Sequence, residues 1–247
     1  MEFNAEYKYD GIRHVEFFFK GKKCIVLMLE DERKRNGKTI LKTEYFGAFP
    51  ELQLEMVKRG YTLLFIENHN RWGTPEQIED QYEFILFASN EFNISSKVIA
   101  IGMSCGGMIS VHLASRHPEV IDCLYLDAPV MNYLSCPARL GDACDVTDGM
   151  WEEFERAWHM TKSELLTFRG HPIDELDVLA KNKIRVYMAY GDSDKTVPYH
   201  ENGIVLERFY HENGLDDLIF IDKKEGVDHH PHGPSDIETT IKFIENK

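Results

Sequence analysis

Short apolar runs alternate with amphipathic segments along most of this chain. The runs show little polar alternation, which is typical of strands buried on both faces of a sheet, and they fall at residues 62–66, 98–101, 123–126, 184–189 and 218–221. The amphipathic segments predict helices at residues 51–59, 76–90, 107–116, 201–213 and 236–246. This alternation predicts an α/β fold, in which helices flank both faces of a mostly parallel central sheet.

The beginning of the chain has a different pattern. Residues 16–20 and 24–29 flank Gly21 and predict two antiparallel strands joined by a tight turn.

One interval, residues 128–183, contains no convincing strand and is longer than a usual connection between strands. Within it, Trp151, Phe154 and Trp158 lie at helical spacing on one face. This face either packs onto the body of the protein or belongs to a cap that lines a substrate pocket. We expect one domain over residues 1–247, with a helical, cap-like insertion at 128–183.

Composition and charge narrow the classes of function. The chain is 43% hydrophobic and 28% charged, as in globular proteins. Lys and Arg number 28 against 42 Asp and Glu, which gives a net charge of −14. This charge repels phosphate backbones and anionic membranes, so we expect neither nucleic acid nor a membrane as a partner. The sequence does not indicate an oligomeric state.

The cysteines and the first residues suggest a reducing compartment. No CxxC pair occurs, and the odd cysteine count argues against a disulfide framework or a zinc site; the cysteines are Cys24, Cys105, Cys123, Cys136 and Cys144. The opening stretch MEFNAEYKYDG is acidic and polar, unlike a secretory signal. We therefore expect a cytoplasmic protein.

A GxSxG motif places a serine between a predicted strand and a predicted helix. Gly102-Met103-Ser104-Cys105-Gly106-Gly107 follows the strand at 98–101 and opens the helix at 107–116. A sharp turn there would strain the serine backbone, and glycines two residues before and after it avoid collisions. Ser104 would then project at the carboxyl edge of the sheet as a candidate nucleophile.

The same turn offers a donor for a developing oxyanion. The amide of Cys105 lies at a helix N-terminus, where N–H groups are unsatisfied. A second donor is expected in the loop at residues 46–48, and we assign it to the amides of Gly47 and Ala48. We interpret the Cys105 side chain as a small buried filler and not as a nucleophilic thiol.

A serine nucleophile needs a base, and the base needs a carboxylate that orients it. The turn Gly191-Asp192-Ser193-Asp194 follows the strand at 184–189, on the same edge as Ser104. Asp192 comes directly after a glycine and suits local hydrogen bonds that close the turn. Asp194 lies farther out, and we predict that it is the acid.

Three histidines follow the last predicted strand, in Gly226-Val227-Asp228-His229-His230-Pro231-His232-Gly233. His229 is closest to the strand and is our candidate for the base. His230 and His232 are interpreted as loop-stabilising or pocket-lining residues. Because neighbouring side chains in such a stretch should diverge and no cysteine lies near, we predict no metal site.

These residues resemble the motifs of the α/β-hydrolase superfamily. GMSCGG at 102–107 is similar to its nucleophile elbow, GDSDKTVP at 191–198 to its acid turn, and GVDHHPHG at 226–233 to its histidine loop. FGAFP at 46–50, DAPV at 127–130 and PIDELDVLAKNKI at 172–184 resemble a bacterial subgroup related to prolyl oligopeptidase catalytic domains and acetyl-xylan-esterase-like hydrolases. Members of that subgroup often carry Arg after the nucleophile and an HG oxyanion motif, where this chain has Cys105 and Phe46-Gly47.

The resemblance implies an α/β-hydrolase fold and a serine hydrolase with the triad Ser104, Asp194 and His229. We expect it to cleave a small or carbohydrate-type carboxylic ester without a metal or organic cofactor. Trp151, Trp158 and Phe46 are expected to contact this substrate. The alternatives are a peptidase or amidase of prolyl-oligopeptidase type and a non-catalytic, ligand-binding protein of the same fold.

Overall fold

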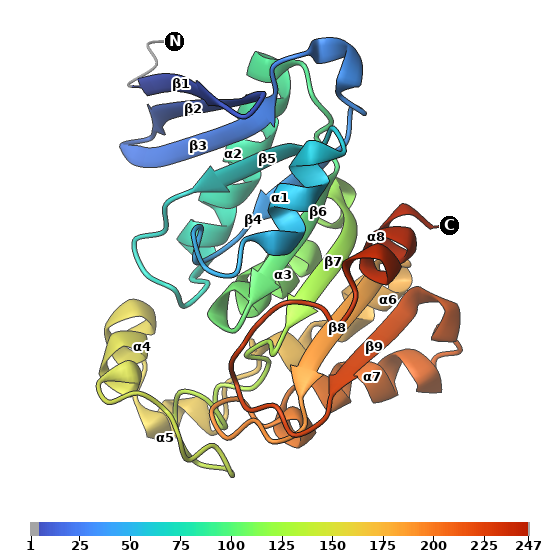
Figure 1. Ribbon diagram of the computed structural model, residues 1–247. Coiled ribbons are helices and arrows are strands. Elements are labelled where there is room, and N and C mark those ends of the chain that lie inside the picture. The colour runs from blue at the N-terminus through green and yellow to red at the C-terminus, as the bar shows by residue number, and fades with distance from the viewer. Residues whose placement is uncertain (1–4, 247) are drawn as a thin grey trace.

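The computed structural model describes residues 5–246, and its centre is a nine-stranded sheet (Figure 1). The strands are β1 (Ala5–Tyr9), β2 (Ile12–Phe19), β3 (Lys22–Leu29), β4 (Thr39–Lys42), β5 (Thr62–Ile66), β6 (Val98–Met103), β7 (Ile121–Asp127), β8 (Arg185–Gly191) and β9 (Ile219–Lys224). Their order in the sheet is β1-β2-β3-β5-β4-β6-β7-β8-β9. The pairs β1–β2, β2–β3 and β3–β5 are antiparallel. All the other neighbouring pairs in this order, from β5–β4 to β8–β9, are parallel.

Helices cover both faces of this sheet, as the alternation predicts. One face carries α1 (Glu51–Lys58) and α8 (Ile237–Glu245), whose Met56 and Ile244 are fully buried against it. The other face carries α2 (Pro75–Phe92), α3 (Cys105–Arg116), α6 (Leu176–Lys181) and α7 (Gly203–Glu212). Single turns of 3-10 helix lie at Glu32–Lys34, Pro118–Val120, Pro172–Asp174, Tyr199–Glu201 and Asp216–Leu218.

The register brings the carboxyl ends of the parallel strands to one edge. Met103, the last residue of β6, pairs with Asp127, the last residue of β7, and Asp127 pairs with Ala189 of β8. β8 in turn pairs with β9 up to Gly191 and Lys224. The segments that follow β6, β8 and β9 therefore leave the sheet at the same edge, which is where open α/β sheets bind ligands.

The predicted strands and helices are present, but two strands escaped prediction. β1 is short and mostly exposed, so its polar sequence gave little signal. β4 is fully buried yet ends in Lys42, whose charge hides a core strand. Burial lowers the pKa of Lys42 to about 8, although Asp127 and Glu44 oppose this shift, and its Nζ has no hydrogen-bond partner within the described chain.

The long interval between β7 and β8 contains helices and no strand. It contains α4 (Met150–Trp158), α5 (Lys162–Leu165) and α6, and the first two lie beyond the carboxyl edge of the sheet (Figure 1). A third apolar cluster fastens α4 to the body, with Phe154 packed edge-on against the fully buried Trp72 at 5.5 Å between ring centroids. That this segment acts as a cap stays a prediction.

No helix within residues 5–246 has both the length and the apolar character required to cross a bilayer.

Candidate active site

Ser104 lies at a strained turn between β6 and α3. Its backbone has φ 51° and ψ −119°, a conformation that is costly for a residue with a Cβ and persists where surrounding packing enforces it. The flanking glycines are required, as predicted. A Cβ on Gly102 would lie 2.3 Å from the Gly106 carbonyl oxygen, and one on Gly106 would lie 3.0 Å from Glu44 Cβ. The turn therefore holds Ser104 at the carboxyl edge of the sheet.

Three distant segments meet at this serine. His229 Nε2 lies 3.1 Å from Ser104 Oγ, and His229 Nδ1 lies 2.7 Å from Asp194 Oδ2. The carboxylate can only accept, so Nδ1 carries the hydrogen and neutral Nε2 accepts from the serine hydroxyl. His229 and Asp194 are 9% and 8% exposed, which keeps most water away from this hydrogen-bonded chain. The structure thus brings together Ser104, His229 and Asp194 as the sequence predicts.

The two aspartates of the turn after β8 have different partners. Asp194 Oδ1 accepts the amides of Thr196 and Val197 at 2.9 and 2.8 Å, which leaves Oδ2 for the histidine. Asp192 instead accepts the Gly226 amide at 2.7 Å and pairs with Lys223, on the exposed side of the turn. The hydrogen bond to that amide, followed by the one to Lys223, holds the pKa of Asp192 below its usual value. Asp192 closes the turn, and Asp194 faces the site.

A second buried carboxylate, that of Asp127, holds the histidine loop at residues 226–233 in place. His232 Nδ1 lies 2.9 Å from Asp127 Oδ1, and Asp127 also accepts the Gly233 amide and the Tyr125 hydroxyl. Burial raises the pKa of Asp127, but the hydrogen bond and charge of His232, together with Lys224, hold it below the usual value. Sequence reasoning gave His232 only a general loop or pocket role and missed this pair.

The three histidine rings converge, whereas the sequence led us to expect divergence. Ring centroids are 5.0 Å apart for His229 and His230, and 4.9 Å apart for both pairs that include His232. The turn at Pro231 and the anchors on Asp194 and Asp127 direct the rings toward one another, an outcome that spacing along the chain does not reveal.

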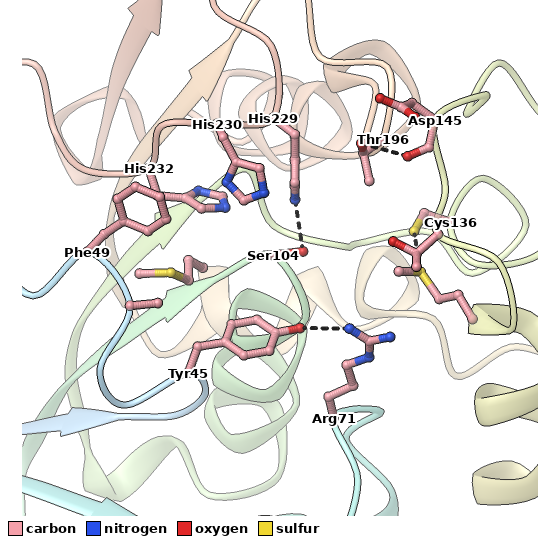
Figure 2. A pocket seen from close by; sticks show the side chains of 14 residues that line it. Tyr45, Phe49, Arg71, Ser104, Cys136, Asp145, Thr196, His229, His230 and His232 are labelled. Carbon is pink, nitrogen blue, oxygen red and sulfur yellow. Dashed lines mark hydrogen bonds between the residues drawn. The ribbon is translucent and has the colours of Figure 1, made fainter.

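A cavity of about 440 Å³ opens around Ser104 (Figure 2). Its wall combines residues from several loops: Tyr45, Ala48, Phe49, Arg71, Met103, Ser104, Cys136, Asp145, Thr147, Met150, Thr196, His229, His230 and His232. The volume is in the range of small-molecule sites. Both the base and the nucleophile therefore face a space that can hold a small substrate.

The loop predicted to supply the second oxyanion donor contributes other groups to this wall. Gly47 is not part of the wall, and the Ala48 amide already donates to the Tyr45 carbonyl at 3.0 Å. Phe46, expected to contact substrate, packs on Phe65 with 4.9 Å between ring centroids. Tyr45 instead lines the cavity, with a strained φ of 53°.

The hydroxyl of Tyr45 and the guanidinium of Arg71 form the wall opposite the histidines (Figure 2). Arg71 Nη1 donates to Tyr45 Oη across 3.4 Å, and Arg71 Nε donates to Glu153 of α4 at 3.0 Å. Burial raises the pKa of Tyr45, so its hydroxyl keeps its proton. No motif in the sequence marks either residue, so neither was predicted.

The backbone amide and the thiol of Cys105 lie in different environments. Cys105 is the first residue of α3, so its amide lies at the open N-terminus of that helix. Its side chain is 1% exposed, and burial raises the pKa of the thiol to about 11. The thiol is therefore protonated at neutral pH, in agreement with a filler role.

Trp151 and Trp158 do not line the cavity around Ser104, contrary to expectation. Trp158 donates from Nε1 to the Trp72 carbonyl at 2.9 Å and packs on Phe154 and Phe168. Trp151 lies on a separate, smaller cavity beneath Lys162. The aromatic stripe of α4 fastens this helix to the protein body, and Met150 is the residue of α4 that reaches the cavity wall.

Residues 59–167 match the family model described as the alpha/beta hydrolase fold. No curated protein matches the sequence.

Two solved structures have a similar fold. One is a candidate dipeptidyl aminopeptidase IV from Bacteroides ovatus ATCC 8483, with a TM-score of 0.70 and 15% identity; the match covers 96% of this chain and 36% of that chain. The other is a cold-adapted esterase from an Arctic intertidal metagenomic library, with polyethylene glycol bound. It has a TM-score of 0.58 and 12% identity, over 93% of this chain and 91% of that chain. The present chain thus spans little more than a third of the first protein, and the predicted subgroup stays a prediction.

The matched family model covers the strand, the serine turn and the helix that follows it, and both structural neighbours share the sheet that carries them. The mostly parallel sheet with helices on both faces agrees with these matches. This chain has the α/β-hydrolase fold.

Proposed function

We propose that this chain is a serine hydrolase that cleaves carboxylic esters through an acyl-enzyme intermediate. The observation that carries the proposal is the hydrogen-bonded chain Ser104–His229–Asp194, with distances of 3.1 and 2.7 Å, on the wall of a cavity. A nucleophile, a base and an orienting carboxylate in this sequence of contacts are what acyl transfer to a serine needs.

In the first half of the reaction, Ser104 Oγ attacks the ester carbonyl while His229 Nε2 accepts the hydroxyl proton. Asp194 holds the imidazole in the required tautomer and stabilises the imidazolium. The tetrahedral intermediate collapses, His229 gives its proton to the departing alcohol, and the acyl group remains on Ser104. In the second half, His229 activates water in the same way, and the free acid leaves.

The oxyanion needs two donors at the cavity wall. The Cys105 amide is one, because it opens α3 next to the nucleophile. For the second we propose the Tyr45 hydroxyl, in place of the Gly47 and Ala48 amides. That hydroxyl accepts from Arg71 and retains its own proton, whereas the Ala48 amide is already engaged. Such donors typically lower the barrier by a few kcal/mol each.

The proposed substrate is a small ester, in keeping with a cavity of about 440 Å³. The wall offers methionine and phenylalanine side chains from Met103, Met150 and Phe49 for an apolar portion, and polar groups from Thr147 and Thr196 for hydroxyls. The proposed substrate class includes carbohydrate-type esters. The reaction as written uses only side chains and water, and a small-molecule ester is its one partner.

The same triad can cleave amides if His229 protonates the amine as it departs, so the ester proposal has to be tested against a peptidase. The experiment compares wild type, Ser104→Ala and the matched control Ser193→Ala on short-chain aryl esters, sugar esters and aminoacyl-naphthylamides. Ser193 is an exposed neighbour of the acid turn whose hydroxyl contacts only Asp192 within the described chain.

We expect wild type and Ser193→Ala to cleave esters at similar rates and Ser104→Ala to lose at least about 10³-fold in kcat/KM. Activity of Ser104→Ala within a few-fold of wild type would contradict the proposal. Turnover of the naphthylamides without a preference for esters would indicate a peptidase or amidase. Absence of turnover together with saturable ligand binding would indicate a non-catalytic member of the superfamily.

A further inference from the structure

The histidine loop presents three imidazoles to one cavity, and the proposed reaction uses only one of them. His229, His230 and His232 all line the cavity beside Ser104 (Figure 2). One ring nitrogen from each lies within 4.8 Å of the others. Three imidazoles at this separation exceed what a single proton transfer requires, so the other two call for an explanation.

Two of the three rings are oriented by buried carboxylates on the side away from the cavity. Asp194 accepts from His229 Nδ1 at 2.7 Å, and Asp127 accepts from His232 Nδ1 at 2.9 Å. Both Nε2 atoms are thereby left as lone-pair donors. A carboxylate behind a histidine, fixing its tautomer and raising its basicity, is the usual outer shell of a metal-ligating imidazole.

The third ring can adjust its position. His230 is exposed, and neither of its ring nitrogens has a hydrogen-bond partner within residues 5–246. Zinc–nitrogen bonds of about 2.0–2.1 Å place tetrahedral ligand atoms about 3.3 Å apart, so the rings must close in from the present separation. No hydrogen bond from the described chain holds the His230 ring, which stacks on Phe49 with 5.8 Å between ring centroids. Binding of an ion would require this ring to rotate, with smaller shifts of the two anchored rings.

Two carboxylates behind the loop favour a cation, and Lys224, 3.7 Å from Asp127, offsets part of their charge. Asp194 and Asp127 lie directly behind two of the rings, and the chain carries a net charge of −14. A set of three imidazoles suits zinc and neighbouring divalent transition metals better than calcium or magnesium, which prefer oxygen ligands. Three histidines also leave a fourth position open to water.

Another cluster on the surface shows the contrast. Asp142, His200 and Glu201 also come within ligating distance of one another. There, however, His200 pairs with Asp142 at 2.9 Å, and Glu201 accepts from the Ser135 hydroxyl and the Asp142 amide. The candidate ligand atoms of this cluster therefore already have hydrogen-bond partners, and the cluster serves below as a control.

We propose that His229, His230 and His232 bind one divalent transition-metal ion, with Zn²⁺ as the representative ion, and that this ion reversibly inhibits the enzyme. The ion takes the Nε2 lone pair of His229, which then cannot accept the Ser104 proton. No bond in the substrate changes and no electron is transferred, because the metal and the serine hydroxyl compete for the same nitrogen. Metal binding stands independently, and only its inhibitory effect rests on the proposed hydrolase function.

The binding test uses full-length, metal-free protein carrying Ser104→Ala, which keeps all three rings and has no turnover. Zn²⁺ is titrated by calorimetry and by competition with a chromogenic chelator. Further variants in this background are His230→Ala, His232→Asn and the control His200→Ala. Asn in place of His232 can keep a donor to Asp127 but lacks Nε2, so it separates loss of a ligand from loss of the buried pair.

We expect one Zn²⁺ per chain, a loss of affinity of about tenfold or more in His230→Ala and in His232→Asn, and no change in His200→Ala. Co²⁺ should give the visible absorption of a tetrahedral complex, and His230→Ala should abolish it. Absence of saturable binding, or binding that both loop variants leave unchanged, would overturn the proposal.

The inhibition test measures ester hydrolysis of chains with an intact Ser104 as Zn²⁺ is raised and then removed with a chelator. We expect at least tenfold inhibition that the chelator reverses. With each variant's rate normalised to its own metal-free rate, the Zn²⁺ concentration that gives half inhibition should rise tenfold or more in His230→Ala. Tight binding without inhibition would overturn the proposed competition at His229. A chain that binds Zn²⁺ through this loop but cleaves no ester would refute the proposed function while leaving the metal site standing.

Discussion

The Nε2 atom of His229 lies 3.1 Å from the Oγ atom of Ser104, although 125 positions separate the two residues in the chain. Two separate structural features produce this contact. The strained turn after β6 projects the serine, with φ at 51°, and the loop after β9 returns the histidine over the same edge of the sheet. The parallel register places both features at that edge, and the buried Asp194 fixes the ring between them.

Replacing Asp194 by Asn should lower kcat/KM for esters by about 10³- to 10⁴-fold. The amide can donate to His229 Nδ1 and would then favour the tautomer whose Nε2 cannot take the serine proton. Asp192→Asn is the matched control, because Asp192 contacts Gly226 and Lys223 and not the histidine. Steady-state kinetics of both variants check this prediction, and equal losses in the two would contradict the assignment of the acid.

Tyr45→Phe should reduce kcat for esters by about a hundredfold while KM changes little, because the hydroxyl acts on the oxyanion more than on the bound ester. The ring, which lines the cavity, is retained in this variant. Gly47→Ala is the control, since a Cβ there meets nothing within 4 Å. A normal kcat in Tyr45→Phe would contradict this assignment and favour a backbone amide of the same loop as the second oxyanion donor.

Asp127→Asn should destabilise the fold by on the order of 3 kcal/mol, because it leaves His232 without its carboxylate in a buried site. Urea denaturation across pH also tests the direction of the pKa shift. The folded-state pKa of Asp127 lies below its unfolded value of about 3.9, so the unfolded state binds more protons as pH falls through this range.

The stability that Asp127 contributes is therefore complete above the unfolded pKa and is lost as pH falls toward the folded value. We expect the free energy of unfolding of the Asn variant to depend less steeply on pH below about 4 than that of wild type. Parallel pH profiles for the two proteins would show that this carboxylate is not paired in the folded state.

Alkylation should distinguish the cysteines of the native protein. Cys144 is exposed, whereas burial raises the pKa of the other four thiols, to about 11 for Cys105, to about 12 for Cys24 and Cys123, and also for Cys136 on the cavity wall. We expect iodoacetamide at neutral pH to modify Cys144 alone, with activity retained. Peptide mass spectrometry after labelling provides the measurement, and modification of Cys105 with parallel loss of activity would point to a reactive thiol beside Ser104.

The site residues that could be predicted from the sequence are those whose roles require a short, recognisable pattern in the neighbouring residues. Gly102 and Gly106 are needed because a Cβ at either position would crowd the turn, so a spacing of glycines around Ser104 revealed the site. Asp194 was recognisable because it follows a strand in a turn, at an edge shared with the serine. A site residue can thus be predicted from the sequence where its position depends on local backbone geometry or on the end of a strand.

The residues missed depend on packing between distant segments. Tyr45 and Arg71 line the cavity through a contact between two loops that no periodicity records. The convergence of His230 and His232 depends on Asp127, which lies in another strand. The face of α4 around Trp158 followed helical spacing, but spacing alone did not decide whether that face meets the protein body or the substrate.

The most direct measurement of the central claim is covalent labelling of the folded protein with a fluorophosphonate, followed by intact-mass and peptide mass spectrometry. We expect one adduct, on Ser104, formed much more slowly in His229→Ala and in Asp194→Asn and absent in Ser104→Ala. A folded protein that takes up no label, or one that is labelled at another residue with Ser104 unmodified, would contradict this claim.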